Sequence, residues 1–331
     1  MVKRLVSVVL CLLLAVMVIG CDKQEPEKIV LNEVTHSVFY APLYAAISLG
    51  FFKEEGLEIE LVNGGGADKS MTALLSGQAQ IGLMGPEAAI YVYNEGKEDS
   101  ALVFGQLTKR DGSFLVGREP NDDFQWCELR GSTVIGGREG GVPEMTLEYV
   151  LRKNGLEPGV DVEVITNIQF NLMGGAFEGG TGDYVTLFEP TASMFVKEGK
   201  GYIMGAVGAE SGEVPYTAFM AKKSYIENNP DIIKRFLRAI YKAQQWVQNA
   251  TDREIAEAIV EHFPDTSVES LVLVAQSYKE IDAWMDTPVM KEEAFNRLQE
   301  IIQQAGILEN TVEFKSVVDT SFALDITGGN Q

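Results

Sequence analysis

The sequence holds few of the residues that bind metals or form disulfides. Its 331 residues include three cysteines and two histidines. Cys11 lies within an apolar leader and Cys21 at its end, so Cys127 has no partner for an intramolecular disulfide. The histidines are His36 and His262, and two histidines with one thiol do not make a zinc site. We therefore expect no metal and no other cofactor.

Basic residues are also scarce. Lys and Arg number 27 against 48 Asp and Glu, a net charge of −21, and loss of the leader with Lys3 and Arg4 lowers it to −23. Such a surface repels phosphate backbones, so nucleic acid is excluded as a partner. Hydrophobic residues make up 46% of the chain, enough for a sizeable core, and roughly 310 residues after the leader predict two domains or one large discontinuous domain.

The first twenty residues have the pattern of an export signal. Lys3 and Arg4 precede an apolar run at 5–19 that only Ser7 interrupts, and Gly20 stands directly before Cys21. As a helix this run reaches about 22 Å, short of the roughly 30 Å hydrocarbon core of a bilayer. The sequence therefore predicts a cleaved signal at 1–20, not a membrane-spanning helix. The polar residues at 21–28 then form a tether.

From residue 29 onward, strand and helix patterns alternate, which predicts a parallel or mixed sheet with helices on both faces. In the first half, strands are expected at 29–32, 57–62, 80–84 and 101–106, and helices at 41–48, up to residue 76, and at 86–93. The alternation restarts near 132, with strands at 132–135, 160–166, 184–188 and 201–207 and a helix at 143–154. The C-terminal part of the sequence predicts helices at 231–248 and near 252–262, 267–284, 289–304 and 312–318. The fold class is therefore α/β, in two units with a helical C-terminal tail.

Several segments carry a resemblance to a known family. Val18-Ile19-Gly20-Cys21 resembles the lipobox of bacterial lipoproteins, in which the cysteine takes a lipid and becomes the new N-terminus. Seven further segments, in order, resemble solute-binding proteins of the sulfonate, nitrate and thiamine-pyrimidine group of ABC importers: 34–46, 50–57, 76–82, 84–87, 143–148, 188–190 and 229–237. The resemblance runs from about 29 to 250 and more weakly to the end.

This resemblance implies a type II periplasmic-binding-protein fold, with two α/β lobes and the ligand enclosed between them. It assigns 29–115 plus 215–331 to lobe 1 and 116–214 to lobe 2. It also implies a monomer that is lipid-anchored through Cys21 on the extracytoplasmic face of the cell membrane. Its partners would be a small solute and the permease and ATPase of an importer.

Candidate ligand-binding residues lie where predicted strands end, because ligands of open α/β sheets bind at the carboxyl ends of strands and at helix N-termini. They are Thr35, His36, Phe39, Tyr40, Gly65, Ser70, Gly85, Glu87, Thr108, Gly137, Arg138, Gly140 and Glu189. The glycine-rich loop at 136–141 lacks the Gly-Lys-Ser/Thr ending of a phosphate loop, so we interpret it as backbone N–H groups facing the cleft.

The side-chain types among these candidates favour one solute chemistry. Carboxylates at Glu87, Glu144 and Glu189 with aromatic rings at Phe39 and Tyr40 favour a planar heterocycle with N–H donors, such as an aminopyrimidine or a flavin-like ring. Arg138 could instead hold a sulfonate or nitrate. Glu87 and Glu144 also suit a plain structural role, since a carboxylate is stabilised at a helix N-terminus.

The chain is not expected to be an enzyme. His36 has no neighbouring nucleophile and orienting acid that would make a triad. The alternative is an enzyme like the thiamine-pyrimidine synthases of the same fold, but those carry a run of cysteines that this chain lacks. A membrane-tethered sensor or adhesin would have no distinguishing feature in the sequence.

Overall fold

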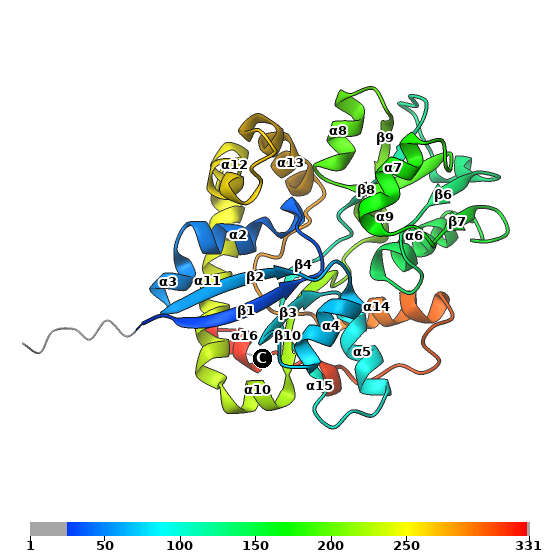
Figure 1. Cartoon of the computed structure of the whole chain (residues 1–331). Coiled ribbons are helices and arrows are strands. Elements are labelled where there is room, and N and C mark those ends of the chain that lie inside the picture. Colours follow the sequence, from blue (N-terminus) through cyan, green and yellow to red (C-terminus); the bar gives the residue numbers. More distant parts are fainter. Residues whose placement is uncertain (1–24, 330–331) are drawn as a thin grey trace, which may run out of the picture.

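The computed structural model describes residues 25–329. Within them the chain forms two lobes, each built on a five-stranded sheet with helices packed around it (Figure 1). The strand order is β2-β1-β3-β10-β4 in lobe 1 and β7-β6-β8-β5-β9 in lobe 2. The two α/β lobes predicted from the sequence are therefore confirmed. The predicted signal at 1–20, Cys21 and the first tether residues lie outside the described residues.

The strands of lobe 1 are β1 (Glu27–Glu33), β2 (Leu57–Asn63), β3 (Ile81–Met84), β4 (Ala101–Thr108) and β10 (Thr217–Lys222). Those of lobe 2 are β5 (Ser113–Gly117), β6 (Thr133–Ile135), β7 (Glu163–Ile165), β8 (Tyr184–Phe188) and β9 (Tyr202–Ala206). The sequence pattern located eight of these ten and missed β5 and β10, which are the two strands that follow a crossover between the lobes.

The helices that precede β10, apart from the short α3, are α2 (Ala41–Ser48), α4 (Ala67–Leu75), α5 (Glu87–Asn94), α6 (Val142–Lys153), α7 (Met173–Glu178), α8 (Thr191–Lys197) and α9 (Val207–Ser211), with the short 3-10 turn η1 (Val38–Tyr40). The C-terminal part adds α11 (Pro230–Asn249), α12 (Asp252–Ile259), η4 (Val260–His262), α13 (Val268–Glu280), α14 (Glu292–Gln304), α15 (Phe314–Val317) and α16 (Ser321–Thr327). The predicted helices of the C-terminal tail are thus confirmed. Short helices at α3 (Phe51–Glu54) and α10 (Lys223–Asn228) complete lobe 1.

Strand direction decides where the functional edge lies. β1, β2 and β3 pair in parallel, and β10 is antiparallel to both β3 and β4, so four strands of lobe 1 run the same way. In lobe 2, β6 pairs in parallel with β7 and β8, while β5 is antiparallel to β8 and β9. Four strands of each sheet therefore share one carboxyl edge, and both crossovers run along that edge.

The crossovers comprise residues 109–112 and 207–216. The expected boundary after residue 115 falls inside β5, whose partners all belong to the second sheet. We therefore propose to divide the chain at the two crossovers. Residues 113–206 then form lobe 2 together with α9 of the second crossover, whose Val207 packs in the lobe 2 cluster, and the rest of the described chain forms lobe 1.

Local sequence explains why the main elements form. All four residues of β3 are buried, as expected of an apolar inner strand of a parallel sheet. Helix α11 starts at Pro230 and buries Ile233, Phe236, Leu237 and Ile240, which recur at helical spacing on one face.

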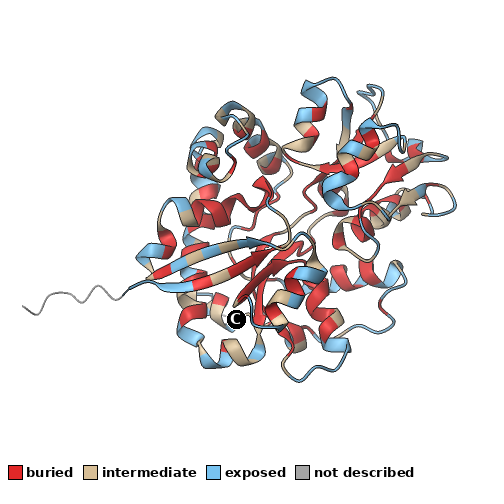
Figure 2. Cartoon of the chain, in the orientation of Figure 1, coloured by how far each residue is buried: buried red, intermediate tan, exposed pale blue. Residues whose placement is uncertain are grey.

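The apolar core extends from lobe 1 into the inner part of lobe 2, and a smaller cluster lies within lobe 2. Figure 2 shows the buried residues concentrated along the sheets and where the lobes meet. Within residues 25–329, no helix has both the length and the apolar character needed to cross a bilayer.

Candidate functional site

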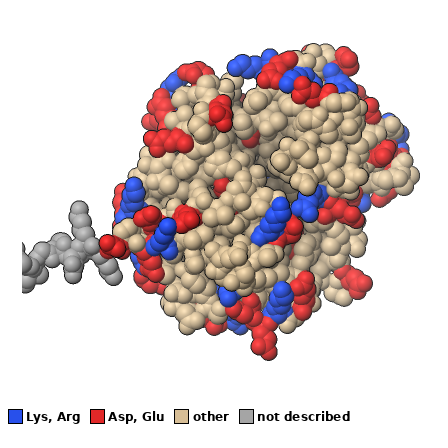
Figure 3. Space-filling model, in the orientation of Figure 1, with Lys and Arg blue, Asp and Glu red and all other residues tan. Residues whose placement is uncertain are grey.

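The carboxyl edges of the two sheets border the space between the lobes, and the space-filling view shows the surface hollowed there (Figure 3). Segments that leave these edges carry the candidate residues. They are η1 after β1, the start of α5 after β3, the first crossover after β4, the loop before α6 and the residue after β8.

Phe39 joins the two lobes through its ring. Ser37 fixes η1 by accepting the Phe39 N–H at 3.2 Å, and the indole Nε1 of Trp284 donates to the Phe39 carbonyl at 2.9 Å. The buried ring lies 5.5 Å from Phe188 of lobe 2 and 5.6 Å from Tyr216 of the second crossover, measured between centroids. Aromatic pairs at this separation contribute about 0.5–1.5 kcal/mol each beyond area burial. The ring is therefore a contact between the lobes in this conformation.

Tyr40 lies beside Phe39, is buried, and its centroid is 5.9 Å from the Phe39 ring. Burial raises the pKa of the Tyr40 hydroxyl above its ordinary value, and the charges of Glu33 and Glu87 raise it further. The hydroxyl therefore stays protonated near neutral pH and can act as a hydrogen-bond donor.

Every acidic side chain that is buried within residues 25–329 lies at the carboxyl end of a strand or in the segment that leads from it. The five are Glu33, Glu87, Asp111, Glu144 and Glu189. No lysine or arginine among the described residues is buried, and the one ion pair of this group joins Glu33 to His36. Buried carboxyl groups without basic partners are costly, so the other four need a reason beyond stability.

Glu87 is the first residue of α5 and is 4% exposed. Its carboxyl group folds back over Gly85, where a Cβ would lie 2.0 Å from Oε2. Burial raises the pKa of Glu87 to about 8, and the N–H groups of Glu87, Ala88 and Val142 oppose that rise. Even so, Oε2 has no hydrogen-bond partner among the described residues. Because Val142 opens α6, this carboxyl lies where the two lobes meet.

Asp111 occupies the first crossover and is fully buried. Its Oδ1 accepts the Ser113 N–H at 2.6 Å. Burial raises the pKa of Asp111 to about 6, and the Ser113 and Tyr216 contacts act in the opposite direction. Neither Asp111 Oδ2 nor the Tyr216 hydroxyl reaches hydrogen-bond geometry with a described residue.

The other two carboxyl groups on the lobe 2 side are engaged within the chain. Glu144 accepts the Gly140 N–H at 3.2 Å, and burial, then the charge of Glu148, raises its pKa. Glu189 accepts both the N–H and the hydroxyl of Ser193, at 2.9 and 2.7 Å, while its own N–H donates to the Tyr278 hydroxyl at 3.1 Å. Burial raises the pKa of Glu189.

His36 is held within lobe 1. Its Nδ1 lies 2.7 Å from Glu33 Oε1, its Nε2 lies 2.8 Å from the His262 carbonyl, and its ring stacks on Phe263 at 4.8 Å. The hydrogen bond to Glu33 raises the pKa of His36. Both ring nitrogens therefore have partners within the protein.

Of the other polar candidates, Ser70 is fully buried and its hydroxyl has no hydrogen-bond partner among the described residues. Thr108 is engaged inside the lobe 1 sheet, where its hydroxyl accepts the Thr217 N–H at 3.0 Å. Arg138 of lobe 2 reaches Asp68 of α4 at 3.1 Å, and both side chains are more than half exposed.

The glycine candidates occupy turns. Gly65, Gly137 and Gly140 have positive φ values of 69°, 114° and 76°, which only glycine adopts readily. The Gly140 carbonyl accepts from the Tyr91 hydroxyl of lobe 1 at 3.2 Å. Thr35 is partly exposed in the loop after β1.

Sequence reasoning missed Asp111, Tyr216 and Tyr278. Asp111 follows β4 by three residues, the offset at which Glu87 follows β3, so a longer search beyond each strand end would have found it. The two tyrosines gave no signal, because their positions depend on the return of the chain from lobe 2 and on the packing of α13.

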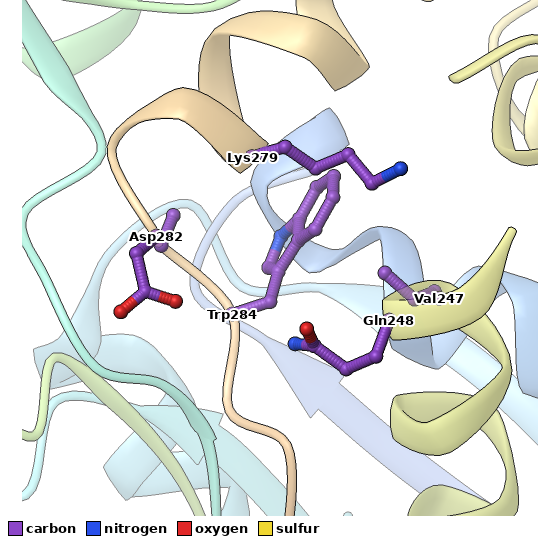
Figure 4. A pocket seen from close by; sticks show the side chains of 6 residues that line it. Val247, Gln248, Lys279, Asp282 and Trp284 are labelled. Atoms are coloured by element: carbon purple, nitrogen blue, oxygen red, sulfur yellow. The ribbon is translucent and has the colours of Figure 1, made fainter. Parts of the chain in front are cut away.

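A separate small pocket of about 170 Å³ lies within lobe 1, between the end of α11 and the segment after α13. Figure 4 shows Trp284 between Lys279, Gln248 and Asp282. Its charged groups are already paired, Lys279 with Asp252 and Asp282 with Lys109. Among residues 25–329, no three His, Cys, Asp or Glu side chains are grouped to hold a metal.

Comparison with known proteins identifies a matching family and a relative that is similar along most of its length. The model of the NMT1-like family matches residues 23–261. YtlA, a proposed binding protein of Bacillus subtilis (strain 168), is 45% identical over 309 residues, which are 93% of this chain and 92% of YtlA. The predicted resemblance to solute-binding proteins is therefore confirmed.

Solved structures share the fold. The alkanesulfonate-binding protein SsuA from Xanthomonas axonopodis pv. citri, bound to MOPS, superposes with a TM-score of 0.71 at 14% identity, covering 90% of this chain and 99% of SsuA. The periplasmic nitrate-binding protein NrtA from Synechocystis PCC 6803 gives 0.71 at 16% identity, covering 92% and 89%. The predicted periplasmic-binding fold is thereby confirmed. The desulfurization enzyme DSZB also shares the fold, at 0.63 and 12% identity over 91% and 99%, so fold alone does not separate binding from catalysis.

Proposed function

Because the chain belongs to the NMT1-like family, we propose that it is an extracytoplasmic solute-binding lipoprotein that delivers a small organic solute to an ABC importer. The solute enters between the carboxyl edges of the two sheets while the crossovers at 109–112 and 207–216 flex. Closure brings the Phe39 ring against Phe188, and the closed form docks on the permease.

The observation that carries the solute class is the pair of buried carboxyl groups at Glu87 and Asp111, each with one oxygen that has no hydrogen-bond partner among the described residues and neither in an ion pair with a described lysine or arginine. Such oxygens can accept hydrogen bonds from N–H donors, each contributing about 0.5–1.5 kcal/mol, or about 1.5–3 kcal/mol where one partner is charged. The aromatic rings of Phe39, Tyr40 and Phe188 suit a flat ring system. The favoured solute is an aminopyrimidine or a flavin-like heterocycle.

Calorimetry with aminopyrimidines, flavins, alkanesulfonates and nitrate tests this proposal directly. We expect a heterocycle with N–H donors to bind, to make the protein more compact in solution scattering and to raise its melting temperature. At one hundred times the dissociation constant, the bound solute stabilises the fold by about 2.7 kcal/mol. Absence of all three effects across the panel would contradict an importer role.

Sulfonate or nitrate is the second candidate solute, since structural relatives of this fold bind those anions. Arg138 at the cleft rim is the group that would hold the anion. Tight binding of a sulfonate that Arg138→Ala abolishes, with no heterocycle bound, would replace the first candidate with this one.

An enzyme like the thiamine-pyrimidine synthases is the remaining alternative. Those proteins use their own histidine, whereas His36 here has both ring nitrogens engaged, by Glu33 and by the His262 carbonyl. A permease gene and an ATPase gene beside the coding gene would support import.

Membrane attachment is a separate part of the proposal, and it rests on Val18-Ile19-Gly20-Cys21. Cys21→Ser should release the protein from membranes or leave it unprocessed, as membrane fractionation would show. A variant that stays membrane-bound at mature size without lipid would contradict the lipoprotein assignment.

A further inference from the structure

Two helix N-termini meet where the lobes face each other, and neither has a side-chain cap. Helix α5 starts after Pro86 and α6 after Gly141, and no side chain of either N-cap residue accepts a hydrogen bond from the first turn. The first N–H groups of a helix have no partner within the helix, and its dipole favours negative charge there. An anion between these two N-termini would be bound from both lobes.

Contacts across the lobes show that the two helix starts are neighbours. Tyr91, one turn after Glu87 on α5, donates from its hydroxyl to the Gly140 carbonyl at 3.2 Å and lies 3.8 Å from Met145 Sδ on α6. The Val142 N–H at the start of α6 acts on the Glu87 carboxyl group, together with the N–H groups at the start of α5. The chain thus supplies its own carboxyl group to this position.

The structure accommodates that carboxyl group specifically. Glu87 is 4% exposed, forms no ion pair with a described lysine or arginine, and has an Oε2 without a hydrogen-bond partner among the described residues. The carboxyl group fits because residue 85 is a glycine without a side chain. A Cβ at residue 85 would lie 2.0 Å from Glu87 Oε2. Burying such a group costs free energy, so its placement calls for a role in recognition.

Glu144 likewise places a carboxyl group against backbone N–H groups, at the glycine-rich loop 136–141. Its Oε2 accepts the Gly140 N–H at 3.2 Å, which is one of the loop donors that the sequence assigned to the ligand. At each of these two places, an acidic side chain of this chain already occupies the backbone N–H groups.

We propose that Glu87 is a resident carboxyl group that fills the anion position between α5 and α6, so that the cleft rejects nitrate- and sulfonate-like solutes and accepts solutes bearing amino groups. This inference rests on the proposed binding function and makes its solute class specific. A solute anion would have to displace a covalently tethered group from the N–H groups at the two helix starts, or lie beside it without those donors. An amino group instead meets the acceptor oxygen that now lacks a partner.

Removal of the carboxyl group is the direct test. Wild type, Glu87→Ala and a control are titrated with sodium nitrate and with methanesulfonate by calorimetry at neutral pH. The control is Glu95→Ala, which removes an exposed acid just past the C-terminal end of the same helix. Glu87→Ser serves as a second variant should the alanine variant fold poorly, because serine suits a helix start.

We expect wild type and Glu95→Ala to bind neither anion measurably and the Glu87 variants to bind at least one at least tenfold more tightly. Wild type that binds nitrate or methanesulfonate with a micromolar dissociation constant would overturn the proposal. So would folded Glu87 variants that gain no anion binding. These results are independent of the native solute. Failure of the whole heterocycle panel on wild type would count against the proposed function, while a gain of anion binding would still support the role of Glu87.

Discussion

Gly112 in the first crossover should not tolerate even one added methyl group. A Cβ there would lie 2.5 Å from two ring carbons of Phe39 and 2.9 Å from a third. The ring cannot move freely, since Phe188, Tyr216 and Tyr278 lie with their centroids 5.2–5.6 Å from it. Overpacking of this kind costs about 1–3 kcal/mol. We therefore expect Gly112→Ala to lower the free energy of unfolding in urea by that amount.

A double variant separates this steric conflict from a general effect on the crossover. Phe39→Leu removes the ring carbons that the new methyl group would meet, so adding Gly112→Ala to it should cost less than about 0.5 kcal/mol. Gly175→Ala is the matched control, because a Cβ there meets nothing within 4 Å and the residue lies in helix α7. It should stabilise the protein by about 0.5–1 kcal/mol. Gly112→Ala with wild-type stability, or with the same cost in both backgrounds, would refute the reasoning.

Two further predictions concern the buried carboxyl groups. With its pKa raised to about 8, Glu87 keeps its proton in the folded protein but loses it in the unfolded chain above about pH 4.5, so its contribution to stability is full at low pH and is lost as pH rises through 8. In urea unfolding, this group should make the free energy of unfolding fall between pH 5 and 8 by up to about 1.4 kcal/mol per pH unit. Glu87→Gln should lessen that pH dependence. A variant with the same pH dependence as wild type would contradict the raised pKa. Glu189→Ala should lower the free energy of unfolding by about 1–3 kcal/mol, because Ser193 loses the acceptor for its N–H and its hydroxyl. Adding Ser193→Ala should cost little more, and fully additive losses in that double variant would argue against the pairing.

The sequence predicted the elements whose signals are local. Helix α2 was expected at 41–48 and occupies those residues, and β8 was expected at 184–188 and does the same. β5 and β10 were missed because their pairing depends on strands from distant parts of the chain, and short strands give weak patterns. β7 was expected at 160–166 but is limited to Glu163–Ile165.

For the site, too, the sequence predicted where residues lie but not what their side chains contact. Residues after strand ends were located because parallel strands bring their carboxyl ends to one edge, and Phe39, Tyr40 and Glu87 all lie there. What each side chain contacts could not be predicted. Thr108 turns into its own sheet, and both oxygens of Glu189 accept from Ser193, because these contacts depend on packing that the local sequence does not encode.

The position of β10 has a consequence for the order in which the protein can fold. All five strands of lobe 2 lie between residues 113 and 206, so its sheet can be completed from one continuous segment. In lobe 1, β10 lies between β3 and β4, so β4 has no strand partner in the sheet until residues 217–222 arrive. Closing that gap brings together segments more than one hundred residues apart, and such long-range pairing is slow. A newly made chain therefore keeps lobe 1 open until late in synthesis, a property that suits the proposed export of the protein.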